Sequence, residues 1–162
     1  MRLLCVLAAL ALAAAARPGP APFTPPPAPT RWVTDTAGFI RENTRESLDA
    51  RLQSYERETG HQVIVWIGRT TGKYPLEDWA TRTFNTWGIG RKDRNDGVAL
   101  FVFSEDRKLR IAVGLGLEDV LTNAICARIV LQIAVPTFRA AEPDGAIVAT
   151  VDARLEHLSR AE

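Results

Sequence analysis

The alternation of apolar and polar residues divides the chain into segments with strand and helix periodicity. Residues 62–67 (QVIVWI) and 98–103 (VALFVF) are continuous apolar runs rich in β-branched and aromatic side chains. Runs of this kind predict strands that are covered on both faces of a sheet. Residues 109–113 place Arg110 between Leu109 and Ile111, and this alternation predicts a third, more exposed strand. Residues 32–40 are too short to assign.

Four segments have helical periodicity. In residues 43–59, Leu48, Leu52 and Tyr55 form a narrow apolar stripe, and Gly60 is placed to cap the helix end. Residues 75–87 begin with a proline that suits a first helical turn and then carry the clearest apolar stripe of the chain.

Two more helices are expected in the last third of the chain. The first runs from Thr122, a suitable N-cap, to residue 135, because Pro136 cannot continue the helical hydrogen bonds. The second begins near Pro143 and buries a stripe formed by Ile147, Val148, Val151, Leu155 and Leu158.

The order of these elements predicts an α/β fold. A strand, a helix and a strand form a right-handed βαβ unit with parallel strands. Residues 104–108 are too few for a crossover, so the third strand must pair antiparallel as a β-hairpin. Four helices on a small mixed sheet form a three-layer α/β/α sandwich.

The two N-terminal segments differ in composition from the rest. Residues 1–16 (MRLLCVLAALALAAAA) place Arg2 before an apolar run that ends in small residues, which predicts a secretory signal peptide. A membrane anchor is the alternative, but the run is shorter than the ~20 residues that a span needs. Residues 17–30 are proline-rich and predict an extended, solvated linker. The folded domain is expected over residues 31–160.

Net charge, cysteine content and missing motifs argue against several classes of function. The formal charge is +1 without a cluster of basic residues, which argues against a nucleic-acid or anionic-membrane partner. After signal cleavage one cysteine, Cys126, remains, so no intrachain disulfide forms, and its apolar segment predicts a buried thiol. The chain lacks the G-x-S-x-G, Walker, H-E-x-x-H and C-x-x-C motifs. His61 and His157 are interpreted as solvated surface residues.

Acidic residues gather in the loops around the predicted strands. They are Asp35, then Asp93 and Asp96 before the second strand, then Glu118 and Asp119 after the third. Asn95 and nearby carbonyl groups add neutral oxygens, and hard cations such as Ca²⁺ prefer oxygen ligands. Two interpretations stay open: the segment DRNDG is an ordinary solvated turn, or the separate segments converge on one cation in a cleft. Gly114 and Gly116 are interpreted as turn glycines with positive φ.

An ordered set of short motifs resembles a known family. The motifs are V-x-D-x-A-G at residues 33–38, E-x-x-T-G at 56–60, W-G-I-G at 87–90, N-D-G-V at 95–98, R-x-x-x-G-x-G-L-E at 110–118, L-T-N at 121–123 and P-x-F at 136–138. This set resembles the TPM domain of YgcG-like secreted bacterial proteins and of a thylakoid-lumen protein of photosystem II repair.

The resemblance implies an α/β/α sandwich, a cleft that binds a divalent metal (Ca²⁺ or Mg²⁺), and an acid phosphatase activity in the plant member. Carried over by position, the metal ligands would be Asp35, Asp96 and Glu118, with Asn95 and Asp93 as further candidates.

Two functions are consistent with these features. The first is a periplasmic or secreted module, without a stable transmembrane anchor after signal cleavage, that helps assemble or maintain envelope or membrane protein complexes. The second is a metal-dependent phosphatase that attacks phosphomonoesters with a metal-bound water. In the second case Arg110 is the candidate phosphate-binding residue. Its alternative role is that of a solvent-facing strand residue.

Overall fold

The computed structural model describes residues 22–140 and 142–159, and these form a four-stranded sheet with the order β1-β2-β3-β4. The strands β1 (Val33–Asp35), β2 (Gln62–Gly68) and β3 (Gly97–Phe103) run parallel. The fourth strand, β4 (Lys108–Val113), pairs antiparallel with β3. The mixed sheet, the βαβ unit and the hairpin predicted from the sequence are confirmed, and β1 lies in the segment that the pattern left unassigned.

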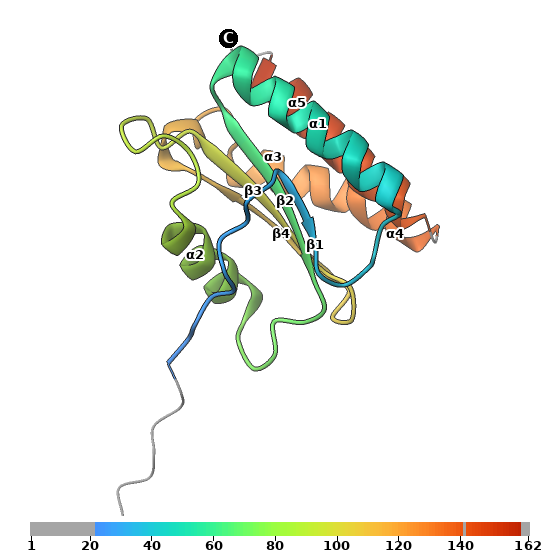
Figure 1. The fold of residues 1–162 in the computed structure, drawn as a ribbon. Coiled ribbons are helices and arrows are strands. Elements are labelled where there is room, and N and C mark those ends of the chain that lie inside the picture. Colours follow the sequence, from blue (N-terminus) through green and yellow to red (C-terminus); the bar gives the residue numbers. More distant parts are fainter. Residues whose placement is uncertain (1–21, 141, 160–162) are drawn as a thin grey trace, which may run out of the picture.

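Helices cover both faces of this sheet (Figure 1). The helices α1 (Glu42–Thr59), α3 (Asn123–Ile129) and α5 (Pro143–Ser159) pack on one face, and α2 (Leu76–Trp87) packs on the other. The fold is therefore the predicted three-layer α/β/α sandwich. Gly60 ends α1 with a φ of 80°, and the side chain of Thr122 caps α3 by accepting from the Ile125 amide, as expected.

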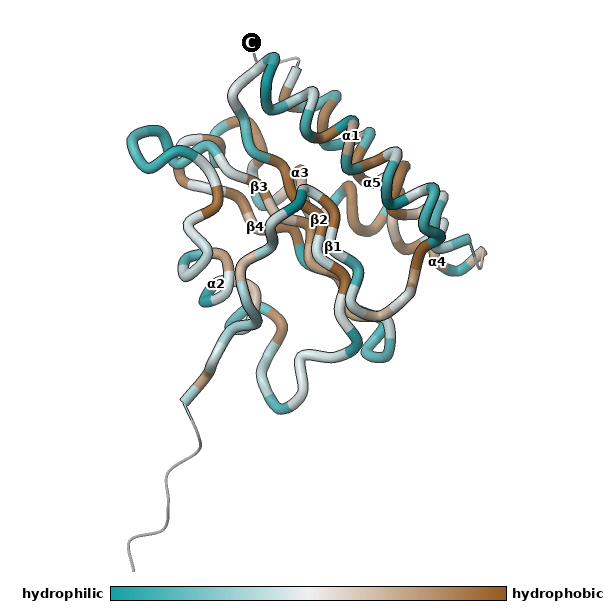
Figure 2. Tube along the Cα trace, viewed as in Figure 1, coloured by the Kyte–Doolittle hydropathy of each residue, from teal (hydrophilic) through white to brown (hydrophobic). Residues whose placement is uncertain are grey.

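Side chains alternate across each strand and build two separate cores. Val63, Val65 and Ile67 of β2 face α1 and α5, while Ile64 and Trp66 face α2. Figure 2 shows the hydrophobic colour concentrated along the central strands and the hydrophilic colour on the outer turns of α1. The side facing α2 is aromatic, because Trp66, Trp79, Trp87, Phe101 and Phe103 contact one another there.

Pro136 does not end the helix that begins after Thr122, so that boundary prediction was wrong. The chain continues through a π-helical turn, η2 (Val130–Ala134), into a short helix, α4 (Val135–Arg139). The amide of Val135 donates to the carbonyl of Val130, one residue farther back than in an α-helix. We attribute the continuation to this wider turn, because it makes room for a proline ring that would clash in an α-helix. Cys126 on α3 is buried as predicted, and burial raises the pKa of its thiol.

The described part of the proline-rich segment, residues 22–30, is extended but lies against the domain. The ring of Phe23 meets those of Tyr74 and Trp79 edge-on, with centroids 4.9 and 6.1 Å away. The indole N–H of Trp87 donates to the carbonyl of Pro26 over 2.9 Å. This part of the segment is therefore held by the aromatic core rather than solvated along its length.

The expected signal peptide at residues 1–16 and the start of the proline-rich segment lie outside the described residues. Among the residues that are described, no helix is both long and apolar enough to cross a membrane.

Candidate functional site

Three backbone segments meet at the amino end of β3, and we call this meeting point the glycine junction. It is formed by residues 89–90, 94–97 and 114–116. A Cβ atom added to Gly97 would lie 2.3 Å from the Ile89 carbonyl oxygen, and one added to Gly116 would lie 1.9 Å from that of Arg94. Gly90 of the W-G-I-G motif and the glycines of the N-D-G-V and G-x-G motifs thus allow the three backbones to approach one another closely.

Backbone hydrogen bonds close the glycine junction. The amide of Gly114 donates to the Gly97 carbonyl over 2.8 Å, and the amide of Gly116 donates to the Asn95 carbonyl over 3.1 Å. Neither Gly114 nor Gly116 has a positive φ, so our interpretation of them as turn glycines was wrong. Their small size, and not their conformational freedom, is what this position requires.

Asp96 is a buried carboxylate beside the glycine junction, with a relative exposure of 3%. Its Oδ1 accepts from the Arg91 amide over 2.8 Å, and its Oδ2 accepts from Arg91 Nε over 2.7 Å and also from Nη2. The Nδ1 atom of His61 lies 3.6 Å from the same Oδ2. Both oxygens of Asp96 are therefore engaged in holding the loop that carries Arg91.

The environment of Asp96 keeps it ionised. Burial is the largest single influence and raises the pKa of this carboxyl group, but the hydrogen bonds and charge of Arg91 outweigh it. The net result is a pKa below the ordinary value. Arg91 responds in the opposite sense, because its hydrogen bond to Asp96 raises the pKa of the guanidinium group.

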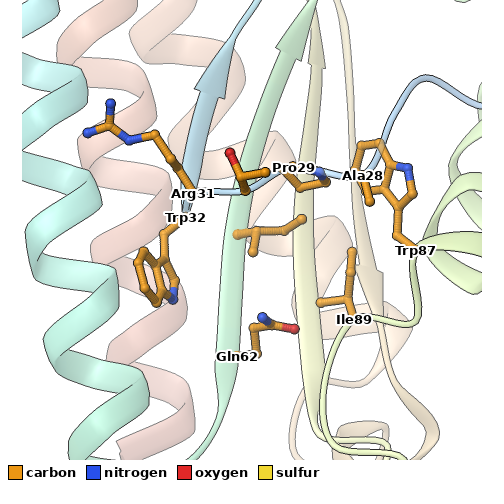
Figure 3. Close-up of a pocket in the computed structure, with 9 residues that line it drawn as sticks. Ala28, Pro29, Arg31, Trp32, Gln62, Trp87 and Ile89 are labelled. Carbon is orange, nitrogen blue, oxygen red and sulfur yellow. The ribbon is translucent and has the colours of Figure 1, made fainter.

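A small pocket of about 140 Å³ adjoins the glycine junction where the proline-rich segment crosses the start of β2. Figure 3 shows Trp87 and Ile89 on one side of this crossing, near Ala28 and Pro29, and Trp32 on the other. Gln62 lines the pocket, and its Oε1 accepts from the Gly90 amide over 2.7 Å. The pocket is thus built by residues that also fix the junction.

Asp35 lies at the opposite end of the strands from Asp96. Asp35 is in register with Ile67 near the end of β2, whereas Gly97 is in register with Gln62 at its start. Five residues of strand separate these positions, which is about 17 Å along the chain. The structure therefore does not bring Asp35 into one cleft with the other acids.

The carboxylate of Asp35 accepts hydrogen bonds from backbone amides close to it in the chain. It accepts from the amides of Ala37, Phe39 and Ile40 over 2.9, 2.7 and 3.0 Å. These bonds shape the turn that leads from β1 into α1. The V-x-D-x-A-G motif is explained by this turn, in which the acid satisfies amide groups that precede the helix.

The remaining candidate ligands are carried by segments at the same end of the sheet as the glycine junction. Asp93, Asn95 and Glu118 are exposed, as is Asp119. Asn95 has a φ of 50°, a left-handed conformation that asparagine tolerates better than most residues. Within the described residues, no three His, Cys, Asp or Glu side chains are close enough to hold a metal ion by themselves.

Arg110 lies in the middle of β4, on the face of the sheet that α2 covers. It is in register with Phe101 of β3, and its Nη1 lies 3.5 Å from Glu77 Oε1 of α2. The structure therefore directs this side chain toward α2.

Sequence reasoning missed the roles of three residues at this site. The side chain of His61 is only 17% exposed and lies against Asp96, so our interpretation of it as solvated was wrong. Arg91 and Gln62 were not singled out at all. Nothing local in the sequence identifies them, because Gln62 and His61 reach the loop only through the pairing of β2 with β3.

Comparison with known proteins identifies the family. The family model of the TPM domain matches residues 33–156. The chain belongs to the TPM domain family. None of the curated proteins compared with this chain matches it.

Solved structures resemble this TPM domain over most of its length. The N-terminal domain of a protein from P. gingivalis is 28% identical with a TM-score of 0.75, covering 82% of this chain and 84% of its own. The BA42 protein of Bizionia argentinensis is 16% identical with a TM-score of 0.66, over 78% of this chain and 86% of its own. The N-terminal domain of the cg2496 protein of Corynebacterium glutamicum is 15% identical, with a TM-score of 0.62 and coverages of 87% and 84%. The last two likenesses concern the fold alone.

Proposed function

We propose that this chain is a secreted or periplasmic TPM-domain protein that acts as an accessory module in the assembly or maintenance of envelope or membrane protein complexes. We further propose that it binds a divalent cation, Ca²⁺ or Mg²⁺, at the glycine junction. The composition of residues 1–16 supports the location, since a basic residue followed by an apolar run and small residues is typical of a signal peptide.

The proposal of a cation site rests on which carboxylates already accept hydrogen bonds from the protein and which do not. Asp35 and Asp96 already accept several hydrogen bonds from the protein. Asp93 and Glu118 are exposed, and neither accepts a hydrogen bond from the part of the chain that the structure describes. The close approach of residues 94–97 to 114–116 brings the segments of these two acids to the same end of the sheet.

The residues present fit a hard cation of loose coordination. Ca²⁺ takes six to eight oxygen ligands, which include amide and backbone carbonyl oxygens and water as well as carboxylates. Asp93, Glu118 and Asn95 would supply side-chain oxygens, and water would supply the rest. Asp35 and Asp96 would then act as residues that fix the loops, not as ligands.

A thermal melt of residues 17–162 with EDTA, and then with Ca²⁺ or Mg²⁺, tests the cation. A ligand that binds only the native state adds about 2.7 kcal/mol when it is present at 100 times its Kd. We expect the midpoint to rise in the wild type and not in the double variant Asp93→Asn/Glu118→Gln. The control variant Asp35→Asn should keep the rise, because Asp35 lies at the other end of the sheet. A midpoint that neither ion moves would contradict the cation site.

The accessory role requires a protein partner in the envelope. Cross-linking of the tagged chain in intact cells, followed by purification, should recover the same envelope proteins from the wild type in repeated preparations. A variant that is unfolded by a core substitution serves as the control for non-specific capture. Recovery of the same proteins by both would remove support for the role.

A metal-dependent acid phosphatase is the second candidate, and the exposure of Asp93 and Glu118 favours it, since substrate could reach a metal bound there. A bound ion would supply an activated water for attack on a phosphomonoester. The orientation of Arg110 toward Glu77 gives this candidate less support, because the expected phosphate-binding residue points at α2. Hydrolysis of p-nitrophenyl phosphate that depends on the ion and falls about 100-fold in Asp93→Asn/Glu118→Gln would favour the enzyme.

A further inference from the structure

A groove of about 790 Å³ lies at the carboxyl end of β3, the opposite end from the glycine junction. Apolar side chains line it: Phe39 from the turn after β1, Leu109 from β4, Val130 from η2, and Val135 and Phe138 from α4. The rings of Phe39 and Phe138 lie with their centroids 5.9 Å apart. The volume falls in the range of about 300–1,000 Å³ that small-molecule sites occupy.

The position of the groove is one where this class of fold binds ligands. In open α/β sheets, ligands sit outside the carboxyl ends of the parallel strands. The groove meets this description, because Val102 and Phe103 at the end of β3 line it together with the turn that follows β1. The helix that contains Pro136 forms the opposite wall, and the π turn in this helix is a feature that often occurs at functional sites.

Three cationic side chains border the groove. Arg107 and Lys108 come from the β3–β4 hairpin, and Arg139 comes from the end of α4. All three are exposed, and no described carboxylate forms an ion pair with any of them. The sequence did not suggest a basic cluster, because the hairpin and α4 are more than 20 residues apart in the chain.

The acids near this end of the sheet are engaged elsewhere. Asp106, on which the charge of Lys108 acts, accepts from the Thr71 amide and the Thr70 hydroxyl, both over 2.8 Å. Asp144 accepts from the Arg41 amide over 3.0 Å and from Arg41 Nε over 3.2 Å. Asp106 thus offsets part of the charge of Lys108, whereas Arg107 and Arg139 stand beside the apolar groove without an ion pair to a described carboxylate.

We propose that this groove binds a small anionic amphiphile, a molecule with one hydrocarbon chain that ends in a carboxylate or a phosphate. The hydrocarbon chain would lie on Phe39, Val135 and Phe138. The head group would be held by Arg107 and Arg139, whose guanidinium groups suit planar, bidentate contacts to carboxylate and phosphate oxygens. Because the groove and the glycine junction lie at opposite ends of β3, this site is independent of the proposed cation.

Isothermal titration of the mature chain with dodecanoate and with dodecyl phosphate, each below its micelle concentration, tests the proposal. Dodecyl maltoside is the uncharged control and dodecyltrimethylammonium is the cationic one. We expect the anionic probes to bind about tenfold or more tightly than the uncharged probe. The ratio between the two anionic probes distinguishes a fatty-acid ligand from one with a phosphate head group.

Substitutions in the groove test whether the probes bind there. The double variant Arg107→Gln/Arg139→Gln should lose the preference for anionic probes, and Val135→Trp should weaken both the anionic and the uncharged probes by filling the groove. The matched control is Arg69→Gln, because Arg69 is exposed at the same end of the sheet but pairs with Glu105 over 2.7 Å and does not line the groove. Nuclear magnetic resonance shifts on titration should fall on residues 102–109 and 130–139.

Three results would overturn the proposal. One is equal affinity for the uncharged and anionic probes in the wild type. Another is an undiminished anionic preference in Arg107→Gln/Arg139→Gln. The third is the absence of binding to the monomeric probes alongside binding to anionic vesicles or to an acidic peptide, which would assign the three cations to a macromolecular surface.

Discussion

Asp96 holds Arg91 through both of its carboxylate oxygens. The Arg91 amide lies 2.8 Å from Oδ1, and the Arg91 Nε atom lies 2.7 Å from Oδ2. Asp96 precedes β3 directly, so this pair closes the loop that leads into the strand. The same loop carries Asp93 and Asn95 to the glycine junction. An acid that the sequence suggested as a metal ligand thus has a structural task within the candidate site.

Replacing Asp96 should destabilise the fold. In Asp96→Asn the amide nitrogen would face the Arg91 guanidinium, and one charge-assisted hydrogen bond would be lost. We expect the free energy of unfolding to fall by about 1–3 kcal/mol, measured by urea denaturation. Asp93→Asn, an exposed neighbour in the same loop, is the control, and with EDTA present throughout it should change stability by less than about 0.5 kcal/mol. Equal losses in the two variants would contradict the structural role of Asp96.

The loss of stability at acidic pH should depend on the carboxylate of Asp96. Arg91 holds the pKa of Asp96 below its ordinary value of 3.8 against the opposing and larger single effect of burial. Just below that pH the unfolded chain binds more protons than the folded chain, so stability falls as the pH falls. In Asp96→Asn the decline of the melting temperature with acid should be shallower. Asp106 and Asp144, whose pKa values are also lowered, keep part of the slope. Parallel curves for the two proteins would refute the assignment.

Substitution of a glycine of the glycine junction by alanine should destabilise the fold. The added methyl group in Gly116→Ala would meet the Arg94 carbonyl at 1.9 Å, so the two backbones would have to separate. We expect a loss of about 2 kcal/mol or more in the free energy of unfolding by urea. In the control Gly145→Ala the new atom would lie 3.8 Å from its nearest neighbour, inside α5. There alanine should stabilise by about 0.5–1 kcal/mol.

Local patterns predicted most of the fold because its elements bury their side chains with regular spacing. The buried strands β2 and β3 are continuous apolar runs, and the stripe of α2 repeats with the helical period. The strand β1 was not predicted because three residues are too few to show an alternation of apolar and polar side chains. The π turn was not predicted because a proline ordinarily indicates a helix end. The widened turn that accommodates this proline is seen only in the backbone geometry.

The candidate site was less predictable because it depends on which strand ends meet. The sequence placed Asp35 and Asp96 in loops next to strands, but parallel strands with these connections put the two loops at opposite ends. Asp96 shares its end with Asp93, Asn95 and Glu118, and Asp35 lies at the other end. The close approach of Gly116 to Arg94 also joins segments about 20 residues apart, and no single motif contains both.

The contact of Phe23 with the aromatic core should hold the proline-rich segment in place. In Phe23→Ala the edge-on contacts with Tyr74 and Trp79 are lost, and the segment should detach more often. A local loss of about 1–2 kcal/mol would speed tryptic cleavage after Arg31 by about 5–30-fold, as followed by mass spectrometry. Leu131→Ala, which truncates an exposed side chain of η2 on the opposite face of the sheet, should leave the rate unchanged. An unchanged rate in Phe23→Ala would show that the segment is held by other contacts.

Arg154 of α5 is a buried cation, and its removal should stabilise the protein. Its exposure is 1%, and none of its three guanidinium nitrogens has a hydrogen-bond partner among the described residues. Burial is the main influence and lowers the pKa of Arg154 to about 10. An unpaired buried charge costs folding free energy, so Arg154→Met should raise the free energy of unfolding at neutral pH by about 1–3 kcal/mol. Arg128→Met, on the exposed side of α3, is the control and should have little effect.

The pH dependence of this gain separates a charge effect from a packing effect. A base whose pKa is lower in the folded chain costs its full penalty below the folded value, and the penalty shrinks as the pH rises through it. The advantage of Arg154→Met over the wild type should therefore be constant between about pH 7 and 9 and decrease above about pH 10. Urea denaturation of both proteins across this range measures the difference. If Arg154→Met is less stable than the wild type at pH 7, the guanidinium group has partners that support the fold, and the cost assigned to its burial is refuted.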